Sequence, residues 1–272
     1  MRQASFSFLS ALSLSACLTP QPEAPVASAT PAPAAPNSQT TSGVKTCSWP
    51  NGAEAAVSLT YDDSLASQVN YAVPALDRVG IKATFFLSGT NLALFGPLAK
   101  HGHELASHTV HHPCNADLAA LSLDDMASEL DAGNTAVQAL GVSGKLTFAY
   151  PCGQTLVKDH ASYVPLVQAR FRAARGVAGI VADPVSVDLF NVPALFPPSS
   201  SDGSDVLAFI ERARQSHGWA VIGVHGVSEA GEYLQLPQAA HDKIIGYLAE
   251  HSGTIWTAPF GSVADVVIAC RH

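Results

Sequence analysis

From about residue 47 to the end of the chain, short apolar runs alternate with longer amphipathic stretches. Runs typical of buried strands occur at residues 55–61, 83–87, 146–150 and 220–224. Stretches with a helical hydrophobic period occur at residues 69–79, 123–140, 206–215 and 239–251. Glycine and proline separate many of these segments. A strand followed by a helix, repeated along a chain, predicts an α/β domain with parallel strands.

The first 45 residues have no such pattern. Arg2 precedes a short apolar run at residues 6–16, which is too short to span a membrane as a stable helix. The run ends in LSAC, which resembles the bacterial lipobox, in which the cysteine (here Cys17) is lipidated. The alternative is an ordinary cleaved signal peptide with an incidental cysteine. The following residues are rich in Pro, Ala, Ser and Thr and are typical of an extended spacer.

We therefore expect a lipoprotein signal peptide at residues 1–16, a linker at 17–45 and one domain at 46–272. The signal and Cys17 together predict an exported protein held on a bacterial envelope by a lipid anchor. Leu18 stands where inner-membrane lipoproteins often carry an aspartate, which favours the outer membrane.

Composition narrows the classes of function. Hydrophobic residues make up 47% of the 272 residues and charged residues 13%, as in a folded domain with a large core. The formal net charge of −8 argues against a nucleic-acid partner, since phosphate binding needs a basic surface. Eleven histidines, against 14 lysines and arginines, are a mild indication of metal or acid–base chemistry.

Export also implies an oxidising compartment, in which the four cysteines beyond Cys17 can pair as disulfides, in three possible ways. Cys47 and Cys270 bracket the domain, so a bond between them would join its two ends. Cys114 and Cys152 each lie beside a candidate site motif. We favour these two pairs.

Polar residues with catalytic chemistry follow several of the predicted strands. In parallel α/β folds, active sites form at the carboxyl edge of the sheet, so these groups can meet there although they are far apart in sequence. They are Asp62 and Asp63 after AAVSLTY, His108 and His112 after HELAS, Tyr150 and Cys152 at the end of KLTFAYPC, and His225 after WAVIGV.

His108 and His112 are four residues apart, which would place both imidazoles on one face of a helical turn. With one carboxylate they form a two-His, one-Asp set that suits catalytic zinc with an open position. Asp62 and Asp63 are adjacent and point differently, so one can bind metal while the other acts as a general base. Taken singly, each motif has a plain alternative: a chance HxxxH spacing, a solvated Asp-Asp loop, and for His225 a core histidine.

Together the motifs resemble those of the polysaccharide deacetylases, the family-four carbohydrate esterases with the NodB homology domain. VSLTYDDS is similar to the T-[FY]-D-D motif, and GHELASHTVHHP is similar to G-H-E followed by H-[ST]-x-x-H-P. FAYPCG and VIGVHG resemble the third and fifth motifs in the same order. The resemblance implies a distorted (β/α) barrel, with about seven parallel strands.

The resemblance also implies residue roles. Asp62 would be the catalytic base and His225 the catalytic acid. A divalent metal, expected to be Zn²⁺, would be held by Asp63, His108 and His112. The backbone N–H of Cys152 would lie in the oxyanion hole.

The chain departs from the family's third motif. Ala149 stands where the family has an arginine that orients the base, and we expect Arg175 to supply that charge from a neighbouring strand. Cys152 stands where the family has a tyrosine, and Tyr150 lies two positions earlier as a candidate substrate-binding group. The fourth motif, which carries an aspartate that tunes the acid histidine, has no clear counterpart; Asp183 and Asp188 are candidates.

We expect an enzyme that removes acetyl groups from polysaccharide or oligosaccharide, with a slight preference for N-acetyl sugars of the chitin or peptidoglycan type. Three alternatives stay open: an O-acetyl xylan esterase with the same site, a catalytically silent carbohydrate-binding protein, and a metal hydrolase for an unrelated ester or amide.

Overall fold

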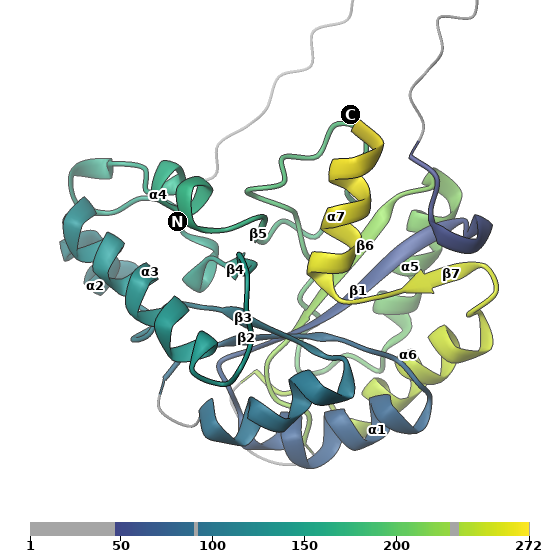
Figure 1. Cartoon of the computed structure of the whole chain (residues 1–272). Coiled ribbons are helices and arrows are strands. Elements are labelled where there is room, and N and C mark those ends of the chain that lie inside the picture. Colours follow the sequence, from purple (N-terminus) through teal and green to yellow (C-terminus); the bar gives the residue numbers. More distant parts are fainter. Residues whose placement is uncertain (1–46, 90–91, 229–233, 272) are drawn as a thin grey trace, which may run out of the picture. The chain divides into compact units, whose positions relative to one another are not determined.

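The computed structural model describes residues 47–89, 92–228 and 234–271 (Figure 1). The expected signal peptide, Cys17 and the linker lie outside the described residues. Within the described part of the chain, no helix is long and apolar enough to cross a membrane.

A seven-stranded parallel sheet forms the centre of the domain (Figure 1). The strand order is β5-β4-β3-β2-β1-β6, and β7 also pairs with β1. The strands are β1 (Ala55–Asp62), β2 (Thr84–Leu87), β3 (Glu104–Ser107), β4 (Phe148–Ala149), β5 (Ala174–Arg175), β6 (Trp219–Val224) and β7 (Ile255–Thr257). The sheet curls into a half-barrel, which confirms the expected α/β fold with a distorted barrel of parallel strands.

The central strand β1 is the branch point of the sheet. It pairs with β6 from Ala56 to Tyr61 along one edge. Its other edge is shared, because β7 pairs near its start and β2 pairs near its end, where Thr60 is opposite Thr84. At the start of β1 the neighbouring strand on this edge is therefore β7. At the carboxyl end of β1 it is β2, which continues the sheet toward β3, β4 and β5.

Helices cover the strands (Figure 1). The amphipathic stretches predict four of the helical regions, although the first begins as a π-helical turn at Gln68–Ala72. The stretch before β3 forms a 3₁₀ segment, Leu92–His101. The helices are α1 (Val73–Arg78), α2 (Asn115–Ala120), α3 (Leu123–Gln138), α4 (Val164–Arg170), α5 (Ser204–Ser216), α6 (Gln238–Glu250) and α7 (Phe260–Arg271).

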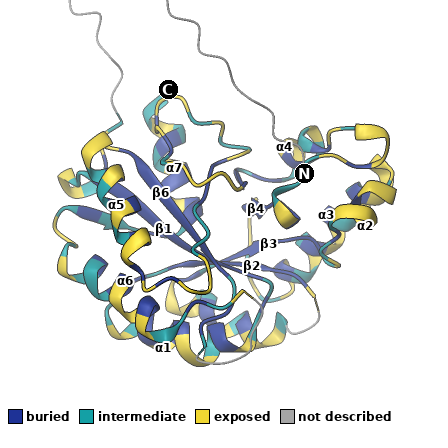
Figure 2. Cartoon of the chain, turned by 180° about the vertical axis from the view of Figure 1, so that it is seen from behind, coloured by how far each residue is buried: buried dark blue, intermediate teal, exposed yellow. Residues whose placement is uncertain are grey.

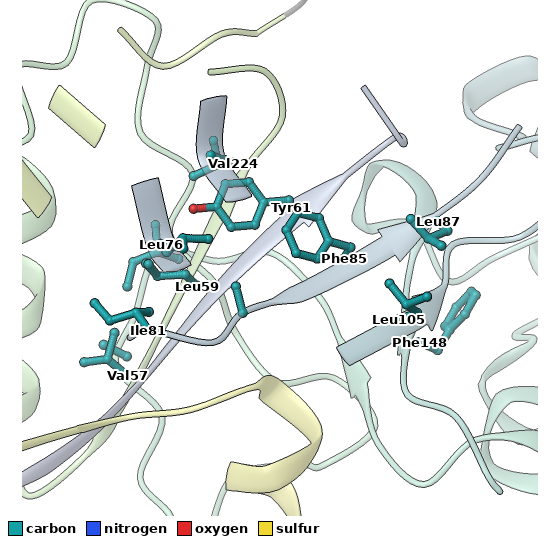
Figure 3. Close-up of a cluster of buried hydrophobic side chains, with 14 of the residues drawn as sticks. Val57, Leu59, Tyr61, Leu76, Ile81, Phe85, Leu87, Leu105, Phe148 and Val224 are labelled. Atoms are coloured by element: carbon teal, nitrogen blue, oxygen red, sulfur yellow. The ribbon is translucent and has the colours of Figure 1, made fainter. Parts of the chain in front are cut away.

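Alternate residues of β1 point to opposite faces of the sheet, as the pleat requires. Val57, Leu59 and Tyr61 pack in the larger core beneath the helices (Figure 3). Ala56 faces the smaller core on the inner side of the half-barrel, together with Trp219 and with Phe260 of α7. Every residue of β1 is buried, as Figure 2 shows for the strands as a group. Asp62 is thus the polar end of a strand that is buried on both faces.

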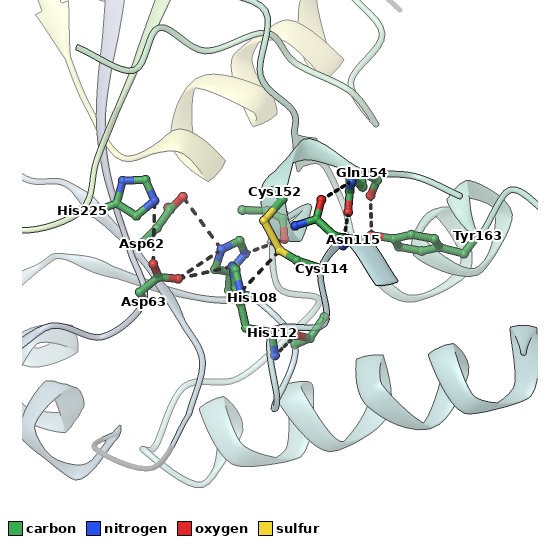
Figure 4. The surroundings of a disulfide bond; sticks show 12 residues. Asp62, Asp63, His108, His112, Cys114, Asn115, Cys152, Gln154, Tyr163 and His225 are labelled. Atoms are coloured by element: carbon green, nitrogen blue, oxygen red, sulfur yellow. Dashed lines mark hydrogen bonds and ion pairs between the residues drawn. A yellow bond between two sulfur atoms is a disulfide. The ribbon is translucent and has the colours of Figure 1, made fainter. Parts of the chain in front are cut away.

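Two disulfides join distant parts of the domain. Cys47 is bonded to Cys270, and Cys114 is bonded to Cys152. These are the two pairs favoured from the sequence. The first joins the two ends of the domain, whereas the second joins the loops after β3 and β4 (Figure 4).

Candidate active site

The carboxyl ends of four strands surround one cavity of about 330 Å³. β1 ends at Asp62, β5 ends at Arg175, and His108 and His225 come directly after β3 and β6. The cavity wall also has an apolar side, formed by Val177, Phe196, Pro197, Pro198 and Leu234. The sheet edge therefore brings the groups singled out in the sequence to one place (Figure 4).

The segment from His108 to His112 is a loop and not a helical turn, so that prediction from the four-residue spacing was wrong. Thr109 and His112 both have positive φ, at 63° and 54°. Pro113 follows and disfavours helical backbone at the residue before it. The hydroxyl of Thr109 accepts a hydrogen bond from the His112 N–H at 3.0 Å. The loop still brings the two imidazoles together, with ring centroids 4.6 Å apart.

Three side chains have the arrangement that a metal ion needs. Nε2 of His108 and Nε2 of His112 lie 3.6 and 3.4 Å from Oδ1 of Asp63. Ligand atoms around a tetrahedral zinc are separated by about 3.4 Å, because each bond is about 2.1 Å long. Among the described residues, this Oδ1 is a buried atom that takes part in no hydrogen bond. The donor set therefore fits a divalent metal.

The environment of His108 prepares it as a ligand. Its Nδ1 lies 2.8 Å from the carbonyl oxygen of Ala149, and donation there leaves the Nε2 lone pair free to face Asp63. Burial lowers the pKa of His108 to about 4, against the opposing effect of Asp62 and Asp63. The imidazole is therefore neutral near pH 7, as metal binding requires.

Asp62 is paired with Arg175. The guanidinium Nη2 donates to Asp62 Oδ2 at 2.5 Å, and both side chains are nearly inaccessible to solvent. Burial raises the pKa of Asp62, but the combined lowering by Arg175, His108 and His225 is larger, so the net pKa is below its ordinary value. The carboxylate is therefore charged and its Oδ1 takes part in no hydrogen bond in the described structure.

Arg175 itself is held between two aromatic rings, which the sequence did not reveal. Its guanidinium carbon lies 5.1 Å from the ring centre of Phe86 and 4.8 Å from that of Phe196. Such contacts stabilise a desolvated cation by about 0.5–2 kcal/mol. The arginine that pairs with Asp62 thus comes from β5. The position in β4 at which the resemblance places an arginine is occupied by Ala149.

His225 faces the same carboxylate as the two other histidines. Its Nε2 lies 3.7 Å from Asp63 Oδ2. The fully buried amide of Gln68 donates to the carbonyl oxygens of Asp62 and His225, at 2.5 and 2.9 Å. Gln68 thus ties the ends of β1 and β6 together, and nothing in the sequence marked it for this position. Asp183 and Asp188 accept hydrogen bonds within their own turns.

The two candidate residues of the third motif, Cys152 and Tyr150, are placed differently in the site. Cys152 lines the cavity and has positive φ, at 52°. Tyr150 also lines the cavity, but its side chain is buried and its hydroxyl donates to the Phe190 carbonyl oxygen at 2.8 Å. The polar group of Tyr150 is therefore bonded within the fold. His111 pairs with Glu129 at 2.6 Å, outside the cluster of candidate ligands.

Known proteins resemble parts of this chain in sequence. An uncharacterized protein, YlxY, of Bacillus subtilis is 37% identical over 86 residues, which are 30% of this chain and 26% of that protein. A chitin deacetylase of a Pestalotiopsis species is 30% identical over 104 residues, which are 36% of this chain and 33% of that protein. The chain thus spans no more than about a third of the length of either relative.

The fold is similar over a longer span. A Mycobacterium smegmatis protein assigned as a polysaccharide deacetylase superposes with a TM-score of 0.60 at 19% identity, covering 82% of this chain and 93% of that one. A sequence model of the polysaccharide deacetylase family matches residues 50–164, the part that holds Asp62, Asp63, His108 and His112. Residues 50–164 thus match the polysaccharide deacetylase family in sequence, and the domain shares its fold with a protein assigned to that family.

Proposed function

We propose that this protein is a metal-dependent hydrolase that removes acetyl groups from polysaccharide or oligosaccharide. The observation that supports it most is the cluster of Asp63, His108 and His112 around an unbonded buried oxygen, with the charged carboxylate of Asp62 beside it. A metal ion and an adjacent charged base can together activate a water molecule for hydrolysis.

The proposed metal is zinc, which suits two histidines and one carboxylate. Held by Asp63, His108 and His112, it would act as a Lewis acid toward the acetyl carbonyl. The second potential set, His112 with Cys114 and Cys152, has both sulfurs in a disulfide and offers no thiolate.

The chain's own residues would divide the proton transfers. Asp62 accepts a proton from the attacking water, and Arg175 keeps this carboxylate oriented and charged beforehand. The backbone N–H of Cys152 donates to the oxyanion as negative charge develops there. His225 gives a proton to the departing sugar nitrogen or oxygen, and acetate leaves with no covalent enzyme intermediate.

We place the N-acetyl sugars first as substrates, because the Pestalotiopsis relative is a chitin deacetylase. The same residues would serve an O-acetyl ester, since only the leaving atom differs. We also propose that a lipid on Cys17 holds the domain on the envelope of the cell, at the outer membrane. Replacing Cys17 with alanine would then release the protein from membranes.

Acetate release by the purified domain tests the proposal. Chitin oligomers and acetylated xylan are offered side by side to chelated protein and to protein restored with zinc. Release that stops with the chelator and returns with zinc supports a metal-dependent deacetylase, and the preferred polymer decides between N- and O-acetyl. Zinc binding at one equivalent without release from either polymer contradicts the proposal and favours a silent binder or a hydrolase for an unrelated substrate.

A further inference from the structure

A short segment after β5 joins the two outer strands of the sheet. Residues 192–196 run alongside both: Val192 forms a parallel bridge with Arg175 of β5, and Leu195 forms one with Ile222 of β6. Because β5 and β6 stand at opposite ends of the strand order, this segment links the two edges of the half-barrel. Its last residue is thereby placed near the carboxyl end of β6, on the wall of the catalytic cavity.

The last residue of this segment is Phe196, and its ring lies against a glycine of β6. A β-carbon on Gly223 would be 2.2 Å from Cζ and 2.3 Å from Cε1 of Phe196. Gly223 stands inside a regular strand, so its backbone does not itself require glycine. The missing side chain instead makes room for the ring, two residues before His225.

The ring of Phe196 packs against two residues of the proposed mechanism. Its centre lies 4.8 Å from the guanidinium carbon of Arg175, which pairs with Asp62. It also lies 5.4 Å from the centre of the His225 imidazole, with the ring planes at 41°. One apolar side chain therefore contacts both the cation beside the proposed base and the proposed acid.

Hydrogen bonds alone do not fix the orientation of Arg175. Its Nη2 donates to Asp62 and its Nη1 donates to the Gly176 carbonyl oxygen at 3.2 Å, but its buried Nε takes part in no hydrogen bond within the described structure. The contacts with the rings of Phe86 and Phe196 supply the remaining constraint. Removal of one ring would therefore leave the guanidinium freer to turn away from the carboxylate.

We propose that Phe196 is a positioning residue for the deacetylation reaction, which holds Arg175 against Asp62 and His225 toward the leaving group. The inference rests on the proposed function and adds to it a residue outside the metal ligands and the proton-transfer pair. A displacement of about 1 Å in reacting groups can lower a rate by about 10²-fold. Loss of a ring that holds two such groups should therefore lower kcat and not substrate binding.

The first test replaces Phe196 with leucine and measures kcat and KM on N-acetylglucosamine oligomers and on an aryl acetate. We expect kcat on the oligomers to fall by about 10–100-fold with KM nearly unchanged. The loss on the aryl acetate should be smaller, since a phenolate leaves without needing a proton from His225. The matched control is Phe209→Leu, which removes a buried ring packed against Arg212 in α5, outside the cavity, and should leave kcat unchanged.

Two results of this test would overturn the inference and leave the deacetylase proposal intact. An unchanged kcat on the oligomers, with or without a rise in KM, would make Phe196 at most a wall against the substrate. Equal losses of kcat on the oligomers and on the aryl acetate would show that the ring does not position His225.

Gly223→Ala tests the same contact from the other side, because the added methyl group must displace the ring. This variant should lose kcat to a similar extent, with zinc content kept at one equivalent. Combined with Phe196→Leu it should cost little more than Phe196→Leu alone, since no ring is left to displace, whereas independent effects would multiply. Multiplied losses in the double variant would overturn the inference.

A measurement without catalysis separates this inference from the proposed function. Hydrogen exchange at the Arg175 guanidinium, followed by NMR, should be about tenfold faster in Phe196→Leu than in the wild type, because the ion pair with Asp62 opens more often. An unchanged exchange rate overturns the inference. Absence of turnover by the wild type on every acetylated substrate overturns the proposed function, and the exchange rates then still decide whether the ring holds Arg175.

Discussion

At the scale of single residues, the site depends on charges kept out of water. A buried carboxylate is costly unless it is paired, and Asp62 has its partner in Arg175. Asp63 has three histidine nitrogens within 3.7 Å, so its two oxygens face a ring of nitrogen atoms. The neighbouring aspartates thus differ in surroundings, which is why one suits a base and the other a metal ligand.

Replacing Asp62 with asparagine removes the base while keeping the shape of the side chain. We expect turnover to fall by about 10²–10⁴-fold, the usual contribution of a general base. Zinc content should stay at one equivalent, because Asp63, His108 and His112 are retained. Turnover and metal content are measured on the same preparation; full activity in this variant would contradict the role of Asp62.

Replacing Arg175 with methionine leaves the buried Asp62 carboxylate without its counter-charge. We expect kcat to fall by at least tenfold, and stability by roughly 3–5 kcal/mol, the cost of breaking a buried ion pair. Arg175→Lys keeps the charge and should recover part of both. Urea unfolding and kcat are measured for the two variants, and equal kcat values in both would argue against a charge effect.

At the scale of elements, two loops carry most of the site, and a disulfide joins them. The loop after β3 holds His108, His112 and Cys114, and the loop after β4 holds Cys152. The Cys114 sulfur lies 3.7 Å from Nδ1 of His112, so the bridge contacts a proposed ligand directly.

Serine replacement of Cys114 and Cys152 should weaken zinc binding by about 10–100-fold, as loss of the groups that support metal ligands commonly does. The matched control replaces Cys47 and Cys270, whose bridge lies at the ends of the domain. With sequence separations of 38 and 223 residues, chain entropy predicts stability losses of about 4 and about 5 kcal/mol respectively.

The two variants should therefore rank in opposite orders: the control loses more stability, and the Cys114 and Cys152 variant loses more zinc affinity. Competition with a chelator and thermal unfolding provide the two measurements. Equal zinc affinity in both variants would show that the bridge near the site serves stability alone.

At the scale of the whole molecule, partly buried polar groups outside the site link separate elements. Glu104, at the start of β3, accepts hydrogen bonds from Thr84, Thr147 and the Gly261 N–H, at 2.7–2.8 Å. It also pairs with Arg172 at 3.0 Å. One carboxylate thus joins strands β2 and β3 to α7, at the end of the strands opposite the catalytic cavity.

Replacing Glu104 with glutamine should lower the free energy of unfolding by about 1–3 kcal/mol, because hydrogen bonds to a charged acceptor are lost and a buried donor loses its partner. Zinc affinity should change little, since the site lies at the other end of the strands. Urea unfolding and chelator competition check the two expectations; a loss of zinc affinity would mean that the two ends of the sheet are coupled.

The buried pair of Tyr61 and His241 makes stability depend on pH. Burial lowers the pKa of His241 to about 4, and its Nε2 lies 2.7 Å from the Tyr61 hydroxyl oxygen. The unfolded chain binds a proton at this residue near its ordinary pKa of about 6.5, whereas the folded protein does so only near 4. The stabilising contribution is therefore present above about pH 6.5 and is lost as the pH falls toward 4, by about 3 kcal/mol.

Unfolding of wild type and His241→Gln between pH 4 and 7.5 checks this value. The difference between their unfolding free energies should shrink as the pH falls, because glutamine does not titrate. Parallel curves would contradict the assignment of this pH dependence to His241.

The sequence by itself determined which local segments carry the chemistry. Apolar runs buried on both faces mark β1, β2 and β6, since such strands must shed polar residues until they end. Asp62 and His225 stand where these runs end, so their meeting at the carboxyl edge follows from parallel pairing alone. β3, β5 and β7 were not predicted, because they have only two to four residues and do not lie in longer apolar runs such as those that mark the equally short β2 and β4.

Only the tertiary structure decided how the site closes. The spacing of His108 and His112 fits a helix, but positive φ angles and Pro113 make a loop with the same outcome. β5 and β1 are four strand steps apart in the sheet order, which is about 19 Å in a flat sheet. Arg175 nevertheless contacts Asp62, because the sheet curls into a half-barrel and brings its edge strand over the central one. Curvature depends on how all the strands pack together, and no local pattern of residues encodes it.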